Sequence, residues 1–157
     1  MLHFAKPTAH TDLKAESMTR HIQTSLQVRT QGKGFYPIGG CINRWLDEIG
    51  CKIGIVTVFC RHTSASLTIQ ENADPKVLED LNEYFERIAP EGCDWVRHLT
   101  EGADDMPAHI RTALTDTTLS IPTNAEGLML GTWQDVYFIE HRNQPHPRTV
   151  ILHYSGL

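Results

Sequence analysis

The part of the chain from residue 117 to residue 157 constrains the fold most, because it contains strand patterns and no helical pattern. Four strands are expected here, at 117–121, 128–130, 134–141 and 149–154. The segment Asn124-Ala125-Glu126-Gly127 is typical of the tight turn that joins antiparallel strands. A run of strands without intervening helices favours antiparallel sheets over the strand–helix–strand order of parallel α/β proteins.

The first half of the chain adds strands and one short helix to this sheet system. The expected order is a half-buried strand from His21, a glycine- and proline-rich turn region at 32–40, a helix at 41–49 and a strand at 53–60. Gly50 directly follows the helix and is a residue suited to end it. Residues 67–70 are expected to be the antiparallel neighbour of the strand at 53–60.

Two further helices have clear start signals. Asp74-Pro75 places a capping side chain before a proline at the first helical position, and one apolar stripe follows as far as Ile88. A second helix begins at Asp105-Met106-Pro107, with Asp105 as the expected N-cap. Three helices and irregularly placed strands predict a single α+β domain with a largely antiparallel sheet system.

Composition limits the classes of function and the cell compartment. At 157 residues one domain is expected, and the net charge of −5 argues against a broad nucleic-acid or membrane-binding surface. No apolar run of 18 residues and no signal-peptide pattern is present, so a cytoplasmic location is expected. The 4 cysteines form no CxxC pair and are predicted to be reduced and structural. Residues 1–17 are predicted to be a flexible extension before the domain at 18–157.

The segment Arg61-His62-Thr63-Ser64-Ala65-Ser66 carries a dense group of polar side chains beside a predicted strand. Hydroxyl and backbone N–H groups bind phosphate oxygens, and Arg61 or His62 would add positive charge. We therefore interpret Arg61, Thr63, Ser64 and Ser66 as candidates for binding a phosphorylated ligand. A turn whose hydroxyl groups bond their own backbone explains the same residues equally well.

Glu71 and Asn72 end the next predicted strand. Glu71 is a candidate general base or metal ligand, and Asn72 is a candidate amide for orienting a ligand. Ordinary turn chemistry before the following helix is the alternative. The hairpin expected between the strands at 53–60 and 67–70 would bring this pair close to His62, which favours a functional role.

A second polar cluster surrounds the helix that begins at Asp105. Asp105 and His109 are four residues apart and therefore lie on one helix face, while His98 comes from the preceding loop. Two imidazoles and a carboxylate suit zinc or another divalent ion, with one coordination position open. Helix capping alone would also explain Asp105.

Trp133 and Gln134 follow a short apolar run bounded by Gly127 and Gly131. Both are candidates for binding an aromatic ring, by stacking and by hydrogen bonding. The alternative is a glycine-bounded hairpin with Trp133 in the core. Glu140, near the end of the next strand, is of interest only if its carboxylate points inward.

Taken together, these motifs resemble the YjbQ-like family, whose members are called secondary thiamine-phosphate synthase enzymes. The resemblance rests on HTSASLTIQEN followed by DP, on EGADDMPAHI, and on GLMLGTWQ and IEHR, and it covers the chain from about Met18 to Leu157. It implies a compact α+β domain with a β-sandwich-like core that assembles as a homotrimer. It also implies that a pyrimidine-methyl pyrophosphate is joined to a thiazole phosphate, with release of pyrophosphate.

The resemblance implies site residues as well. The positions that match the family motifs are His62, Thr63, Ser64, Ser66, Glu71, Asn72, His98 and His109. The chain departs from the family pattern beside His98, where Trp95 stands in a tyrosine position and Leu99 in an aspartate position. Asp104 or Asp105 is expected to supply the missing carboxylate.

The expected function is thus a transfer reaction on a small phosphorylated heterocycle, with zinc or magnesium as cofactor. The catalytic candidates are His62, Glu71 and Asn72. The chain lacks a basic cluster of the kind that suits a dedicated pyrophosphate-binding enzyme, which favours a weak or side activity. Two alternatives stay open: a metal-dependent hydrolase with Glu71 as the base, and a non-catalytic trimer that binds a metal or small ligand.

Overall fold

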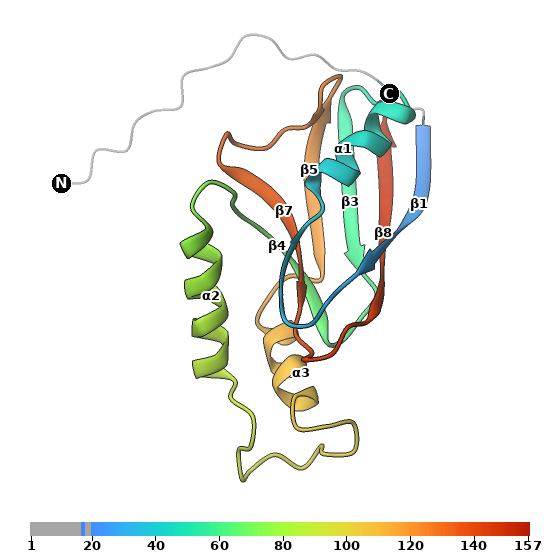
Figure 1. Cartoon of the computed structure of the whole chain (residues 1–157). Helices are drawn as coiled ribbons and strands as arrows, with labels where there is room; N and C mark the ends of the chain where they lie inside the picture. The colour runs from blue at the N-terminus through green and yellow to red at the C-terminus, as the bar shows by residue number, and fades with distance from the viewer. Residues whose placement is uncertain (1–16, 18–19) are drawn as a thin grey trace, which may run out of the picture.

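Two antiparallel sheets form the body of the molecule (Figure 1). The computed structural model describes Ser17 and residues 20–157. The larger sheet contains, in spatial order, β1 (Arg20–Arg29), β8 (Pro147–Gly156), β3 (Gly54–Cys60), β5 (Thr118–Asn124) and β6 (Gly127–Leu128). The smaller sheet contains β2 (Gly34–Pro37), β7 (Gln134–Glu140) and β4 (Ala65–Glu71). The predicted α+β class with antiparallel sheets is confirmed.

The hydrophobic core lies between the two sheets. Alternate residues of β3 and β8 point inward from the larger sheet, and Leu67, Val136 and Phe138 point inward from the smaller one. Each of these residues is buried. The opposite face of the larger sheet carries Ile55 and Phe59, which are 41% and 44% exposed. One face of the larger sheet therefore closes the core, while the other is open.

Three helices flank the sheets, as predicted: α1 (Gly39–Glu48), α2 (Pro75–Ile88) and α3 (Asp105–Ala113). In Figure 1, α1 lies at the top beside the larger sheet, α2 stands at the side of β4 and β7, and α3 lies below the sheets. The Asp74 side chain caps α2 by accepting a hydrogen bond from the Lys76 backbone N–H at 2.9 Å, as its sequence predicts. No residue of α2 is fully buried, so its apolar stripe is only partly covered.

The prediction that residues 67–70 pair with strand 53–60 is wrong. β3 pairs with β5 and β8 in the larger sheet, whereas β4 pairs with β7 in the smaller one. Residues 61–64 therefore cross from one sheet to the other and do not form a hairpin. The expected turn region at 32–40 also contains a short strand, β2, which pairs with β7.

Other predicted strands are present in the structure, but their ends differ from those predicted. β5 extends to Asn124, and β6 is reduced to two residues. Residues 1–16 of the predicted extension at 1–17 lie outside the described part of the chain. Residues 18–19 of the predicted domain also lie outside it. Within the described residues, no helix is long and apolar enough to cross a membrane.

Candidate functional site

The structure brings together the three residues that the sequence predicts as metal ligands. Asp105 is the first residue of α3, His109 lies one turn later, and His98 comes from the preceding loop. Oδ2 of Asp105 lies 2.9 Å from Nε2 of His98 and 3.2 Å from Nε2 of His109. We call these three residues the His-Asp-His cluster. Its potential ligand atoms all lie within 4.8 Å of one another, and the Asp105 side chain is 2% exposed.

The protonation of His109 is fixed on one side by a backbone contact. Its Nδ1 lies 2.9 Å from the carbonyl oxygen of Thr63, and a carbonyl can only accept, so Nδ1 carries a proton. In the neutral ring, Nε2 then presents a lone pair to the carboxylate of Asp105. Two lone pairs 3.2 Å apart repel each other, so the contact is favourable only with a proton or a bound cation between the two atoms.

Asp105 does not act as the N-cap that its sequence position suggests. The N-cap of α3 is Asp104, which makes no capping hydrogen bond with its side chain. The carboxylate of Asp105 is instead shared between the cluster and Arg142, whose Nη1 bonds Oδ1. Asp105 thus supplies the carboxylate beside His98 that the departure from the family pattern left missing.

Arg142 holds the acidic side of the cluster in place. Its three guanidinium nitrogens bond Asp105, Oδ2 of Asp104 at 3.0 Å and the carbonyl of Glu101 at 2.6 Å. Burial alone would raise the pKa of Asp104, but the Asn143 N–H and Arg142 outweigh it and lower that pKa. Sequence reasoning missed Arg142, although it belongs to the IEHR motif.

The turn before α3 is shaped for this arrangement. Gly102 has φ +110°, a conformation that residues with a side chain rarely adopt. A Cβ atom at this position would also lie 3.0 Å from Oδ1 of Asp104. Glycine therefore lets the loop approach the Asp104 carboxylate closely.

His62 lies next to the cluster but has a structural bond of its own. Its Nε2 accepts a hydrogen bond from the backbone N–H of Thr149 at 2.8 Å. Burial, followed by the positive charge of Arg148, lowers the pKa of His62, which favours the neutral ring. With Nε2 acting as acceptor, the ring proton lies on Nδ1.

The hydroxyl groups expected to bind phosphate have separate environments. Thr63 is exposed and Ser64 is half-buried, whereas Ser66 is fully buried. The hydroxyl of Ser66 bonds Nε2 of His141 at 2.8 Å inside the protein. Burial, followed by the charge of Arg111, lowers the pKa of His141 to about 3. Ser66 is thus part of an internal polar pair, away from the surface cavities.

Two adjoining surface cavities, one of which is lined by His109 of the cluster, have three lining residues in common, His62, Thr63 and Thr117. One has a volume of about 440 Å³ and extends past His109 to the end of α3. The other, of about 360 Å³, extends toward Phe59 and Arg61. We call the two together the threonine groove.

The remaining predicted residues lie at the opposite end of β4. Glu71 pairs with Gln134 across β4 and β7, and the Asn72 backbone N–H bonds the carbonyl of Trp133 at 2.9 Å. Ala65 and Glu71 are the two ends of β4, so about 20 Å separates Glu71 from the end of the strand that follows Thr63. Trp133 is 65% exposed and is not a core residue. We call Glu71, Asn72, Trp133 and Gln134 the distal group.

Two ion pairs that contain buried arginines lie near the cluster end of the molecule, and sequence reasoning did not predict the pairing. Glu140 is 1% exposed and binds Arg148 through two hydrogen bonds of 2.6 and 2.7 Å. Burial would raise the pKa of Glu140, but Arg148 and the Arg142 N–H lower it. Arg111 likewise binds Glu86 of α2 through two hydrogen bonds, of 3.0 and 3.1 Å. The sequence around Arg148 on β8 and around Arg111 on α3 contains no local pattern that indicates these ion pairs.

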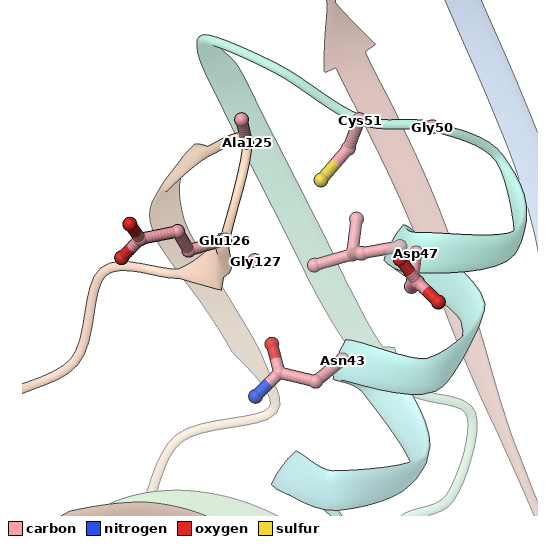
Figure 2. Close-up of a pocket in the computed structure, with 8 residues that line it drawn as sticks. Asn43, Asp47, Gly50, Cys51, Ala125, Glu126 and Gly127 are labelled. Carbon is pink, nitrogen blue, oxygen red and sulfur yellow. The ribbon is translucent and has the colours of Figure 1, made fainter.

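A further pocket lies at the other end of the molecule, between α1 and the turn before β6 (Figure 2). It encloses about 290 Å³, and Asn43, Asp47, Cys51 and Glu126 are among its lining residues. The Asn43 side chain bonds the backbone N–H of Leu128 at 2.9 Å, and the Cys51 thiol bonds the carbonyl of Asn124 at 3.3 Å. Asn43 and Cys51 therefore join α1 and the residues after it to the adjacent turn.

The sequence profile of the UPF0047 protein YjbQ-like family matches residues 23–157. The chain belongs to the YjbQ-like family. A UPF0047 protein of Synechocystis is 53% identical over 137 residues, which cover 87% of this chain and 93% of the relative. The YjbQ protein of Escherichia coli O157:H7 is 35% identical over 135 residues, covering 85% and 97%.

Two solved structures share this fold. The conserved hypothetical protein TT1486 from Thermus thermophilus superposes with a TM-score of 0.74 at 35% identity, covering 82% of this chain and 97% of that one. The hypothetical protein APE1520 from Aeropyrum pernix gives a TM-score of 0.78 at 29% identity, covering 87% and 99%. These two proteins therefore share the single α+β domain of this chain.

Proposed function

We propose that this YjbQ-like protein is a zinc-dependent enzyme that acts on a small phosphorylated substrate at the His-Asp-His cluster. The observation that carries the proposal is the pair of contacts made by His109. Its Nδ1 proton is committed to the Thr63 carbonyl, while its Nε2 faces the buried carboxylate of Asp105 at 3.2 Å. A divalent cation at this point would replace the repulsion between lone pairs with two ligand bonds.

The donor set and its spacing fit zinc. Ligands about 2.0 to 2.1 Å from a tetrahedral zinc ion lie roughly 3.3 Å from each other. The contacts of Asp105 with His98 and His109, at 2.9 and 3.2 Å, are close to that value. Two imidazole nitrogens also favour zinc over magnesium, which prefers oxygen ligands. The Thr63 carbonyl and Arg142 orient His109 and Asp105, as supporting residues do in known zinc sites.

We propose coupling of the thiamine-phosphate synthase type as the reaction. A nitrogen of the thiazole phosphate forms a bond to the methylene carbon of the pyrimidine, the bond from that carbon to oxygen breaks, and pyrophosphate leaves with the electron pair. When bound, zinc would neutralise charge on the departing pyrophosphate as a Lewis acid. The chain itself would orient both substrates and exclude water from the reacting carbon.

The surroundings of the cluster favour coupling over hydrolysis. Coupling requires no proton abstraction, whereas hydrolysis is assisted by a general base. Nε2 of His62 already accepts the Thr149 N–H, and Glu71 lies at the far end of β4. Neither residue is placed to act as a base at the cluster within one subunit.

We also propose that the protein assembles as a homotrimer. The open face of the larger sheet exposes Ile55 and Phe59, and α2 exposes Tyr84 and Ile88. Contact between two different surfaces of neighbouring copies generates a closed ring when the rotation allows it. Light scattering on the purified protein at micromolar concentration tests the proposal, and a monomeric mass would contradict it.

The decisive experiment for the reaction measures zinc and product in the same preparation. The protein is purified from a host without its own thiamine-phosphate synthase and assayed with the pyrimidine pyrophosphate and the thiazole phosphate. We expect the coupled product from wild type, its loss in His109→Gln together with loss of zinc, and its retention in the control Lys76→Ala. Release of inorganic phosphate without coupled product would instead identify a hydrolase. Zinc binding without turnover would identify a binding protein.

A further inference from the structure

The threonine groove differs from the rest of the surface in its charge. The chain contains 19 acidic and 14 basic residues, yet no carboxylate is among the residues that line the two cavities. One cavity reaches Arg61, an exposed cation that makes no ion pair within the described residues. A groove without carboxylates in an acidic protein repels an anion less than the surrounding surface does.

Hydrogen-bond donors in the groove are free to bind a ligand. Within the described part of the chain, the hydroxyl groups of Thr63 and Thr117 make no hydrogen bond to another protein group. Thr115 also lines the groove, but its hydroxyl already donates to the carbonyl of Arg111 at 2.7 Å. Two threonines therefore offer donors at the place where the two cavities meet.

His62 adds a third donor at the same place. Because its Nε2 accepts the Thr149 N–H, the neutral ring carries its proton on Nδ1. His62 lines both cavities. The contact with Thr149 thus fixes the tautomer in which Nδ1 of His62 is a hydrogen-bond donor.

We propose that the threonine groove binds the phosphate group of the substrate through His62, Thr63, Thr117 and Arg61. The proposal rests on the proposed function, because it places the phosphate beside the His-Asp-His cluster, which shares His109 with the groove. The groove replaces the predicted set of hydroxyls, since Ser66 is buried against His141 and Thr117 takes its place.

The first test measures pyrophosphate binding to the metal-free protein by titration calorimetry. We expect Thr117→Val and Arg61→Gln each to weaken binding about tenfold, the size expected for one charge-assisted hydrogen bond. Thr118→Val is the matched control, because Thr118 is exposed on β5 and does not line the groove. Affinity unchanged in Thr117→Val and Arg61→Gln, or no binding to the wild type, overturns the proposal.

A pair of variants separates the two nitrogens of His62. Gln at this position keeps an acceptor for the Thr149 N–H and removes the donor at Nδ1, whereas Asn keeps a donor near Nδ1 and removes the acceptor. We expect His62→Gln to lose about tenfold in pyrophosphate affinity, the size of one such bond, and His62→Asn to bind nearly as wild type while unfolding at lower temperature. The reverse order of affinities overturns the role of His62 as donor.

Asp105→Asn distinguishes this proposal from the proposed function. We expect this variant to lose zinc and to keep the wild-type affinity of the metal-free protein for pyrophosphate. Wild-type protein that binds pyrophosphate in the groove but never zinc overturns the zinc-dependent function and leaves the phosphate site supported. Zinc binding with pyrophosphate affinity insensitive to all groove variants overturns the phosphate site alone.

Discussion

The two ends of the β4–β7 pair carry similar numbers of polar residues and differ in how these residues are held. At one end, Asp105 is buried, fixed by Arg142 and adjacent to a groove. At the other, Trp133 is exposed and Asn72 bonds only nearby backbone. Polar density in the sequence marks both ends, whereas within the described part of the chain the buried carboxylate of Asp105 and the cavity beside it lie at the first end. The following variants test that contrast in matched pairs.

The largest expected effect concerns the stability of the protein at the cluster end. Glu140→Gln leaves Arg148 buried without its charge partner, which typically costs about 3 to 5 kcal/mol of unfolding free energy. At the distal end, Glu71→Gln is expected to change stability by less than about 0.5 kcal/mol. Urea denaturation of both variants checks the pair. Equal losses would remove the contrast.

The next largest effect concerns the affinity of the protein for zinc. Asp105→Asn removes the carboxylate between His98 and His109, and we expect zinc affinity to fall at least about 100-fold, more than the loss of an orienting residue causes. Glu71→Gln should bind zinc as wild type. Competition with a chromogenic chelator gives both constants, and a zinc loss in Glu71→Gln would assign the metal to the distal group.

Arg142 is expected to act on zinc only through the cluster. Arg142→Gln frees Oδ1 of Asp105 and should lower zinc affinity about 10- to 100-fold, as substitution of orienting residues does elsewhere. Arg87→Gln, which removes an exposed pair with Glu83 on α2, is the control. If the two variants bind zinc equally well, Arg142 does not orient the cluster.

A smaller effect concerns the pH dependence of stability. Because the pKa of His141 is about 3 in the folded protein and near 6.5 when unfolded, the unfolded chain takes up a proton between these values that the folded protein does not. His141 thus destabilises the fold as pH drops below 6.5, by up to about 1.4 kcal/mol per pH unit. Folded His141→Gln protein should lose less stability than wild type between pH 6.5 and 5.5 in urea titrations. Gln134→Ala should follow the wild-type curve, and an unchanged slope in His141→Gln would contradict the buried neutral ring.

The smallest effect is expected at Trp133. Its side chain is 65% exposed in the single chain, so Trp133→Ala should change the unfolding free energy of the monomer by less than about 0.5 kcal/mol. Thermal unfolding at low protein concentration checks this value. A large loss would contradict the exposed position of Trp133 in the single chain.

Sequence patterns correctly predicted the structural features that depend on residues close together in the chain. The Asp74-Pro75 start of α2 and the four-residue spacing of Asp105 and His109 both depend on positions within one or two helical turns. The pairing of β3 and β4 was predicted wrongly, because alternation within a strand does not indicate which sheet it joins. Arg142 was missed for a related reason, since it lies 37 positions from Asp105 and only tertiary packing brings the two together.

The pairing of β1 with β8 has a consequence for how the chain is made. These strands form a ten-residue ladder from Arg20 opposite Gly156 to Arg29 opposite Pro147. The first described strand therefore cannot pair until the last strand has been synthesised and has left the ribosome. Until then β3 also lacks its central partner, and its edge is exposed to other chains. Contacts so distant in sequence favour slow folding after synthesis. Newly made protein should therefore depend on chaperones more than a helical domain of the same length.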